Sequence, residues 1–245
     1  MSKLHEPLAK HDPIIRLRGV CRDYGEGDVV VHALSDVDLD VAGGEFVAMA
    51  GPSGSGKSTL LNLVGALDRA SAGTVEVCGH DLSGLSASDL SALRRDHIGF
   101  VFQNFNLLPV LTALENAEYV LVLQGCPARE RRERVMAILE EVGLAGMTDR
   151  LPRELSGGQQ QRVAIARAIV SEPALVLADE PTANVDSKVG GALLDLMHAL
   201  HEEKGITFLF STHDREVMLR AERLVLLRDG CIGEDGPPGT LLDGV

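Results

Sequence analysis

The chain is short of positive charge. Among its 245 residues, 23 Lys and Arg stand against 36 Asp and Glu, so the formal net charge is −13. An acidic chain gains no counterion-release energy from DNA or RNA, and its overall charge does not draw it to anionic lipid. We therefore expect no nucleic-acid partner and no direct electrostatic binding to a membrane surface.

The chain also lacks paired cysteines and long apolar runs. Its cysteines, Cys21, Cys78, Cys126 and Cys231, are scattered with no CxxC pair, which predicts reduced thiols in a cytoplasmic protein. No stretch approaches the roughly 18 apolar residues of a membrane span. The polar residues 1–13 have no apolar signal core and are expected to form a loose, disordered tail. Any membrane association is therefore expected to go through a partner.

The composition is that of an ordinary globular protein, with 45% hydrophobic and 24% charged residues. The length of 245 residues is enough for one domain with a small inserted lobe. Short apolar strands alternate with helices in the second half of the chain, which predicts an α/β fold with a parallel sheet covered on both faces. The predicted strands are residues 14–20, 29–41, 45–50, 74–77, 98–102, 174–178, 207–210 and 224–227; helices are predicted at 57–67, within 104–155, from 156, and between 178 and 207.

The strongest motif is a glycine-rich run at residues 51–59, which follows an apolar strand and precedes an apolar-striped helix. Its glycines let backbone N–H groups converge on phosphate oxygens, and the helix N-terminus adds a favourable dipole. Lys57 supplies positive charge for the β- and γ-phosphates, and Ser58 offers a hydroxyl to Mg²⁺. The alternative is a turn that only caps a helix. The predicted nucleotide-binding residues are Gly51, Pro52, Ser53, Gly54, Ser55, Gly56, Lys57, Ser58 and Thr59.

Two carboxylates, Asp179 and Glu180, follow the predicted strand at residues 174–178. Ligands bind at the C-terminal ends of strands in open α/β sheets. We expect Asp179 to contribute to the Mg²⁺ shell and Glu180 to polarise the attacking water as general base. The same pair could cap a helix instead, but its place downstream of a phosphate loop favours the catalytic role.

A third motif, Leu-Ser-Gly-Gly-Gln at residues 155–159 followed by Gln-Gln-Arg-Val-Ala-Ile-Ala-Arg-Ala, resembles the signature motif of ATP-binding cassette (ABC) ATPases. Physically it is a second helix N-terminus lined by small residues, which suits an anion while its serine caps the helix. The resemblance implies a head-to-tail homodimer in the ATP-bound state. Each ATP would then lie between the phosphate loop of one subunit and Ser156, Gly157, Gly158 and Gln159 of the other.

The same resemblance implies roles for isolated residues. Tyr24 is similar to the aromatic residue that stacks on adenine, although it could equally be a core residue. Gln103 resembles the glutamine that senses Mg²⁺ and water at the lobe hinge. His213 resembles the switch histidine that contacts the γ-phosphate, at a place where a lone histidine is otherwise structural. The expected catalytic residues are Glu180, His213 and Gln103, and the expected metal contacts are Ser58, Gln103 and Asp179.

The resemblance covers residues 14–233 and implies the ABC ATPase fold, a P-loop NTPase (RecA-like) core with an N-terminal antiparallel β-subdomain and an inserted helical subdomain. Within one domain at residues 14–245, we expect the nucleotide-binding core at about 14–103 and 161–245. The helical subdomain is expected at 104–160, where it would grip an integral membrane permease subunit on the cytoplasmic face of the inner membrane. We expect no C-terminal regulatory domain.

A narrower resemblance concerns the task that ATP drives. Residues 104–116, 177–182 and the extended segment 25–33 are similar to the lipoprotein-release and macrolide-exporter ATPase branch, which implies export, lipoprotein extraction or mechanical transmission. The alternatives are an ATPase that regulates cell division through a membrane partner and a soluble iron–sulfur assembly ATPase. DNA-repair relatives carry long coiled coils, which this chain lacks. Ala183 and Val185 depart from the residues common in close relatives and imply a slightly altered dimer geometry.

Two further clusters are expected to be structural. The arginines at positions 129, 131, 132 and 134 adjoin the apolar stripe of a predicted helix and are interpreted as a solvated face rather than an anion site. His198 and His201 lie three residues apart on another predicted helix. They could bind a metal, but we expect a surface pair.

Overall fold

The computed structural model describes residues 13–25 and 30–242. The predicted tail at residues 1–13 lies outside the described residues apart from Pro13, which begins a strand rather than ending the tail. Residues 26–29, part of the segment compared with the exporter branch, also lie outside them.

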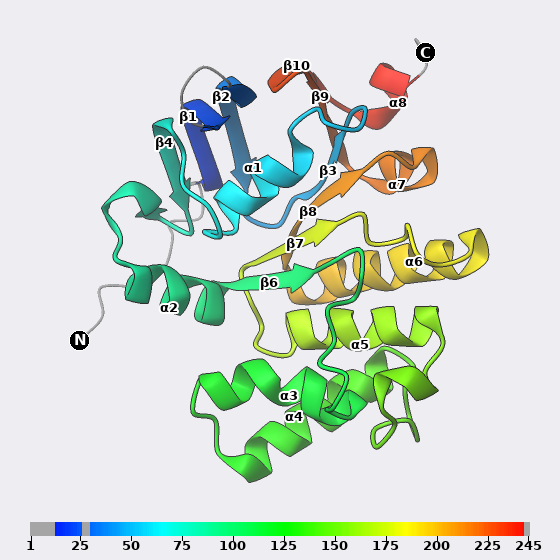
Figure 1. Ribbon diagram of the computed structural model, residues 1–245. Helices are drawn as coiled ribbons and strands as arrows, with labels where there is room; N and C mark the ends of the chain where they lie inside the picture. Colours follow the sequence, from blue (N-terminus) through cyan, green and yellow to red (C-terminus); the bar gives the residue numbers. More distant parts are fainter. Residues whose placement is uncertain (1–12, 26–29, 243–245) are drawn as a thin grey trace.

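A six-stranded sheet forms the centre of the molecule, in the order β10-β9-β3-β8-β7-β6 (Figure 1). All neighbouring pairs are parallel except β9 with the edge strand β10. The three central strands are apolar and buried along nearly their whole length, as expected for a sheet covered on both faces. The predicted parallel sheet is therefore confirmed. Its strands are β3 (Phe46–Ala50), β6 (Ile98–Val101), β7 (Leu175–Asp179), β8 (Thr207–Thr212), β9 (Arg223–Arg228) and β10 (Cys231–Gly236).

A second, antiparallel sheet is built from the N-terminal part of the chain, in the order β2-β1-β4-β5. In β2 the buried residues Val37, Leu39 and Val41 alternate with exposed aspartates, so one face packs inward and the other meets solvent. Helix α1 (Lys57–Val64) lies between this sheet and the central one, and side chains from all three form one hydrophobic cluster. The strands are β1 (Pro13–Tyr24), β2 (Val31–Ala42), β4 (Ala72–Val77) and β5 (His80–Asp81).

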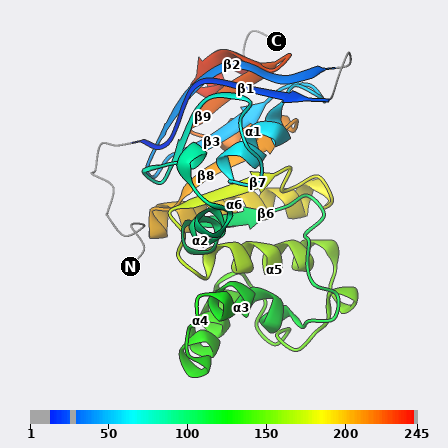
Figure 2. The ribbon, with the colours of Figure 1, turned by 60° about the vertical axis from the view of Figure 1, so that its left-hand side comes forward.

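Helices on the opposite side of the central sheet form successive layers (Figure 2). Helices α5 (Gly157–Ile169) and α6 (Ser187–Lys204) cover the sheet, and α3 (Ala113–Leu123) and α4 (Ala128–Glu141) pack on the far side of α5. Helix α5 begins at Gly157, so the expected subdomain boundary at residue 160 falls inside its first turn. The same helix contacts both β6 and α3. The division into a core and a helical subdomain stays a prediction.

The structure adds elements that the sequence pattern did not predict. Helix α2 (Ala87–His97) buries only Leu90 and Leu93 on an otherwise polar helix, so it shows little apolar periodicity. Strand β10 is a polar edge strand, and α8 (Pro238–Leu242) follows it, so the strand predicted at residues 224–227 is not the last. The short elements η1 (Leu82–Gly84), η2 (Pro152–Glu154) and α7 (Arg215–Arg220) complete the described fold.

The predicted helical stretch at residues 104–155 is helical only in part. Residues 102–112 form a loop in which Phe105 and Asn106 have positive φ angles of 60° and 48°, a backbone conformation that no α-helix contains. Helix α3 begins after Thr112, whose side chain accepts a hydrogen bond from the backbone N–H of Glu115 in a capping box. The apolar run before this cap therefore serves a loop and not a helix.

The arginine cluster is not a uniformly solvated face. Arg129 is exposed and pairs with Glu133 one turn later on the same helix. Arg131, however, bonds to the partly buried Glu118 of α3 at 2.8 Å, and Arg134 donates to the carbonyl oxygen of Val170. These two arginines join α4 to its neighbours, so the prediction of a solvated face is wrong for them.

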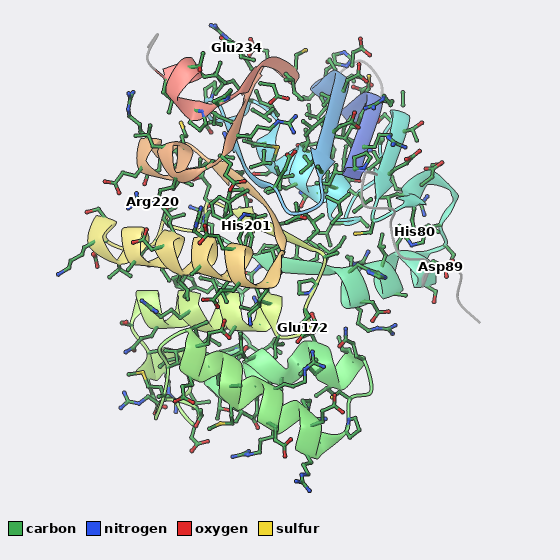
Figure 3. The ribbon with its side chains drawn as sticks, turned by 180° about the vertical axis from the view of Figure 1, so that it is seen from behind. His80, Asp89, Glu172, His201, Arg220 and Glu234 are labelled. Carbon is green, nitrogen blue, oxygen red and sulfur yellow. The ribbon has the colours of Figure 1, made fainter. Side chains whose placement is uncertain are left out.

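The histidine pair on α6 is not a surface pair either. His201, labelled on α6 in Figure 3, is buried. Its Nδ1 lies 2.9 Å from the carbonyl oxygen of Ile206, and its ring packs on Phe46. His198 contacts the edge of the same phenyl ring.

Within the described ranges, no group of three or more His, Cys, Asp or Glu side chains could hold a metal ion. The helices of those ranges also lack the combination of length and apolar character that a membrane crossing needs.

Close contact between β6 and α5 generates a stability prediction. A Cβ atom on Gly99 of β6 would lie 2.3 Å from the carbonyl oxygen of Ala168, so Gly99→Ala must push α5 away from the sheet. We expect a loss of about 1–3 kcal/mol in the free energy of unfolding, measured by urea denaturation.

The matched control is Gly84→Ala, because a Cβ atom there meets nothing within 4 Å. This variant should change the free energy of unfolding by no more than about 0.5 kcal/mol. Equal urea midpoints for the two variants would contradict backbone-to-backbone packing of α5 on β6.

Candidate functional site

The glycine-rich loop joins the end of β3 to the start of α1. Gly56 caps the helix with a φ angle of 104°, and a Cβ atom at this position would lie 2.7 Å from the carbonyl oxygen of Ala33. A Cβ atom on Gly51 would lie 2.1 Å from the carbonyl oxygen of Leu227. The loop is therefore curled against β2 and β9 at a distance that only glycine permits.

The side chain of Lys57, the first residue of α1, folds back into this loop. Its side-chain ammonium donates to the carbonyl oxygens of Gly51 at 2.7 Å and Pro52 at 3.0 Å, and the residue is only 8% exposed. The hydroxyl of Ser55 is buried as well, with no hydrogen-bond partner in the described part of the chain. A fixed cation and a free polar atom in a loop at a helix N-terminus make a cradle suited to phosphate.

Carboxylates from the end of β7 face the start of α1. Ser58 Oγ donates to Asp179 Oδ1 at 3.3 Å, and Ser211 of β8 donates to the same carboxylate oxygen. Hydroxyl and carboxylate oxygens are the ligands that Mg²⁺ prefers. Because the described ranges contain no group of three or more His, Cys, Asp or Glu side chains that could hold a metal, an ion here would complete its shell with phosphate oxygens and water. The residues therefore fit Mg²⁺ that arrives with a nucleotide.

Glu180 continues past β7 in a strained backbone conformation, with a φ angle of 48°. Its backbone N–H donates to the carbonyl oxygen of Ser211 at 3.1 Å, which anchors the turn to β8. Its carboxylate is 16% exposed, and Oε1 lies 2.8 Å from Nδ1 of His213. A carboxylate and an imidazole in contact, both open to the same cleft, are equipped for proton transfer.

These side chains line one open cleft with a volume of about 610 Å³. The structure brings eleven of the predicted residues together around it, and it adds Val31, His32 and Ala33 of β2, which the sequence did not indicate. The imidazole of His32 is held by Asp23 at 2.7 Å across the hairpin. The predicted residues on the cleft wall are Ser53, Gly54, Ser55, Gly56, Lys57, Ser58, Thr59, Gln103, Asp179, Glu180 and His213.

Other predicted residues are not on the cleft wall. The carbonyl groups of Gly51 and Pro52 turn toward Lys57 within the loop. Tyr24 lies at the hairpin end, directly opposite the cleft residue Val31 in the pairing of β1 with β2. Its ring does not belong to the hydrophobic clusters of the core, so the alternative core role has no support in the described structure.

The signature residues lie apart from the cleft of their own chain. Ser156 caps α5, with its Oγ accepting from the backbone N–H of Gln159 and its own N–H donating to Oε1 of Gln159. The expected N-cap is therefore present. Gly157 faces the carbonyl oxygen of Asn184 on the loop before α6. One copy of the chain does not place this second helix N-terminus against its own phosphate cradle.

The loop after Gln103 is tied to the signature helix by an arginine that the sequence analysis did not single out. Arg167 of α5 donates to the carbonyl oxygens of Phe105 at 2.8 Å and Asn106 at 2.6 Å. Burial lowers the pKa of Arg167, so it is held in a desolvated place. The sequence signal that could have identified this residue is its place as a lone charge inside the otherwise apolar run of residues 163–169. Asn184 also bonds the carbonyl oxygen of Gln103, which fixes the same loop from the other side.

A glycine-rich phosphate cradle before a helix, paired carboxylates at the end of another parallel strand of the same sheet, and an antiparallel sheet packed on α1 together define an ABC-type ATPase fold. The profile of the family described as "ABC transporter" matches residues 34–183. The chain belongs to the ABC transporter family.

Curated relatives share nearly half of the aligned residues. The chain is 48% identical over 227 residues to the macrolide export ATP-binding/permease protein MacB 1/2 of Paracoccus denitrificans, covering 93% of this chain and 34% of the relative. It is 47% identical over 223 residues to MacB of Brucella melitensis, covering 91% of this chain and again 34% of the relative. The chain thus spans about a third of the length of these relatives.

Solved structures agree in fold. An ATP-binding cassette captured as a dimer in a post-hydrolysis state with ADP and Pi has a TM-score of 0.85 and 42% identity, covering 91% of this chain and 98% of that one. The cassette cbiO1 of Clostridium perfringens, part of the ABC transporter complex cbiONQ, has a TM-score of 0.86 and 28% identity, covering 95% and 92%. The predicted ABC ATPase fold is confirmed.

The phosphate cradle generates a binding prediction. Lys57→Ala removes the only ammonium group within the loop, and a hydrogen bond to a charged group contributes about 1.5–3 kcal/mol. We expect the Kd for ATP to rise at least about 10-fold in calorimetric titration.

Lys204→Ala is the matched control, because Lys204 makes an ion pair with Glu141 on the helical side of the molecule, away from the cleft. It should leave the Kd for ATP unchanged. Undiminished ATP binding by the Lys57 variant would contradict the phosphate cradle.

Proposed function

We propose that this chain binds and hydrolyses ATP with Mg²⁺ and serves as the nucleotide-binding component of an ABC transporter. The observation that carries the proposal is the single cleft on which Lys57, Ser58, Asp179, Glu180 and His213 converge. Each of these residue types has a defined task in phosphoryl transfer to water, and catalysis of that reaction is mostly positioning and electrostatic stabilisation.

Binding begins at the loop. The backbone N–H groups of residues 53–57 and the ammonium group of Lys57 neutralise the negative charge of the β- and γ-phosphates. Ser58 and Asp179 would hold Mg²⁺, which spreads charge on the phosphate oxygens when it is bound. Gln103 lies on the same wall and would contact the ion or the attacking water.

Glu180 acts as the general base in this mechanism. The hydrogen bond from its backbone to Ser211 and its strained φ angle hold the carboxylate on the cleft wall, where it can accept a proton from water. His213, 2.8 Å from that carboxylate, orients it and adds a donor for the γ-phosphate. This contact couples the two side chains on the cleft wall.

A second copy of the chain completes the site. The phosphate cradle is open, and the second helix N-terminus lies away from it on the same chain, at Ser156, Gly157, Gly158 and Gln159. We propose that ATP closes a head-to-tail homodimer by joining the cradle of one subunit to the signature residues of the other, and that hydrolysis reopens it. The solved relative with ADP and Pi is itself a dimer.

The helical subdomain at residues 104–160 would transmit this closure to an integral membrane permease. Several large apolar side chains of this stretch are exposed to solvent, which supports a protein partner. Through that partner the chain would sit on the cytoplasmic face of the inner membrane, and the macrolide export relatives favour export as the work done. Lipoprotein extraction and mechanical transmission are the alternatives within the same ATPase branch. The exposed apolar residues are Leu108, Val110, Tyr119, Val122, Leu123 and Met136.

The base assignment predicts the behaviour of Glu180→Gln. The amide keeps the shape of the side chain but cannot accept the proton, so turnover should fall at least about 100-fold while the Kd for ATP stays within a few-fold. With ATP, size-exclusion chromatography should show an accumulated dimer.

Glu133→Gln serves as the control, because Glu133 is exposed on α4 and pairs only with Arg129 among the interactions described. It should hydrolyse ATP at the wild-type rate. Near-wild-type turnover by the Glu180 variant would show that another group is the base.

The permease proposal is tested by native purification in mild detergent from the source cells. We expect a polypeptide with membrane spans to accompany the chain, either as a separate subunit or as part of the same product. Val110→Asp combined with Leu123→Asp places charges on the exposed apolar surface and should abolish that association without changing the Kd for ATP. Recovery of only a soluble scaffold protein would overturn the transporter proposal.

A further inference from the structure

Tyr24 is held in place by two other side chains. Its hydroxyl donates to Oδ2 of Asp68 at 2.7 Å, and the guanidinium carbon of Arg22 lies 4.3 Å from the centre of its ring. The cation covers one face of the ring, at a distance typical of a cation–π contact. The residue nevertheless stays 38% exposed. An exposed aromatic ring with its hydroxyl bound and one face covered is prepared to receive a flat ligand on the other face.

Asp68 is the centre of this arrangement. Besides the hydroxyl of Tyr24, its carboxylate accepts from Nε and Nη2 of Arg22, both at 2.9 Å, and from the backbone N–H of Arg69 at 2.8 Å. Burial opposes its ionisation, but the donors from Tyr24, Arg69 and Arg22 outweigh that effect and lower the pKa of Asp68. One carboxylate thus fixes both the ring and the cation behind it.

Asp68 also connects the ring to the phosphate cradle. It follows the C-terminal end of α1, where its backbone N–H donates to the carbonyl oxygen of Asn62. The same helix begins at Lys57, directly after the cradle. Because an α-helix rises about 1.5 Å per residue and is stiff over this length, its two ends keep a constant separation. The helix therefore sets how far the ring of Tyr24 lies from the phosphates.

The position of the ring relative to the cleft agrees with this role. Tyr24 is paired directly with Val31 across the β1–β2 hairpin, and Val31 lines the cleft that holds the phosphate cradle. Side chains of directly paired residues lie on the same face of a sheet. Figure 1 shows this hairpin beside α1.

We propose that Asp68, with Arg22, is a positioning residue for the base of the nucleotide. It locks the ring of Tyr24 at a set distance from Lys57 before ATP binds, so that the adenine stacks on a platform that needs no further ordering. The inference rests on the proposed function, since it assumes that ATP occupies the cleft and stacks on Tyr24. A purely structural cluster would stabilise the hairpin without favouring a ligand that carries a base.

The test compares two ligands on the full chain. Asp68→Asn should raise the Kd for ATP about 3- to 10-fold, because an unrestrained ring must be ordered on binding. The Kd for inorganic tripolyphosphate, which has no base, should not change, and the rate at saturating ATP should also stay the same. Equal weakening of both ligands would overturn the proposal, because Asp68 would then act on the phosphate cradle through α1.

Asp96→Asn is the matched control. Asp96 forms a comparable ion pair with Arg95 on α2, and its side chain is 24% exposed against 26% for Asp68. The hydrogen bond from Arg95 lowers the pKa of Asp96. Its carboxylate bonds to Arg95 of its own helix and not to Tyr24. This variant should bind ATP and tripolyphosphate like the wild type, and its loss of stability calibrates that of the Asp68 variant.

A spectroscopic signal reports on the ring itself. The chain contains no tryptophan and only two tyrosines, so Tyr119→Phe leaves Tyr24 as the single tyrosine and the main source of intrinsic emission. ATP should alter that emission, and tripolyphosphate should not. In the same background, Asp68→Asn should shift the midpoint of the ATP titration to a concentration about 3- to 10-fold higher, the same factor as for the Kd.

Tyr24→Ala separates the two levels of the argument. If it leaves the Kd for ATP unchanged, adenine does not stack on Tyr24 and that part of the proposed function is wrong. If it weakens ATP binding while Asp68→Asn has no effect, the proposed function stands and the positioning role of Asp68 is wrong. The double variant should bind ATP no more weakly than Tyr24→Ala alone, because Asp68 acts only through the ring.

Discussion

The burial of α1 between the two sheets is the constraint on which the rest of the site depends. The buried apolar side chains of α1 belong to one hydrophobic cluster with both sheets, so the helix cannot shift without opening that cluster. These side chains are Leu60, Leu61, Leu63 and Val64. Its N-terminus carries the phosphate cradle, and Asp68 just beyond its C-terminus holds the ring of Tyr24. A single packed helix thereby sets the geometry of the nucleotide cleft at both ends.

The parallel strands supply the opposite wall for a reason of topology. Strands β3, β7 and β8 are neighbours and run in the same direction, so their C-terminal ends meet at one edge of the sheet. This edge collects the cradle after β3, Asp179 and Glu180 at the end of β7, and His213 after β8. The strain at Glu180 is tolerated because its backbone N–H is bound by Ser211 of the adjacent strand.

The helical side of the molecule is tied to this edge through the loop after Gln103. Arg167 of the signature helix and Asn184 of the loop before α6 both bond backbone carbonyls of that loop, and two of its residues have left-handed backbones. A loop held by bonds at its carbonyl groups can change conformation when those bonds are exchanged. The hydrogen bonds from Arg167 and Asn184 to this loop therefore link the cleft to the signature helix.

Local pattern was enough for much of the fold and for the residues at the edge of the sheet. The apolar strands β3, β7 and β8 and the glycine-rich loop were predictable, since each depends on residues close together in the chain. The edge strand β10, the polar helix α2 and the loop at residues 102–112 were not, because their conformation depends on tertiary partners and not on apolar periodicity. The roles of the individual site residues stay predictions for experiment.

The sequence by itself determined the chemistry available to this protein: a phosphate loop, two carboxylates, a histidine and a second helix N-terminus, each within a short run of residues. Only the tertiary structure decided which of these meet. It joined Tyr24 to Asp68 across 44 positions of the chain, brought His32 to the cleft, and left the signature residues apart from it. The physical reason is that hydrogen bonds and packing act over a few ångströms in space, whatever the separation along the chain.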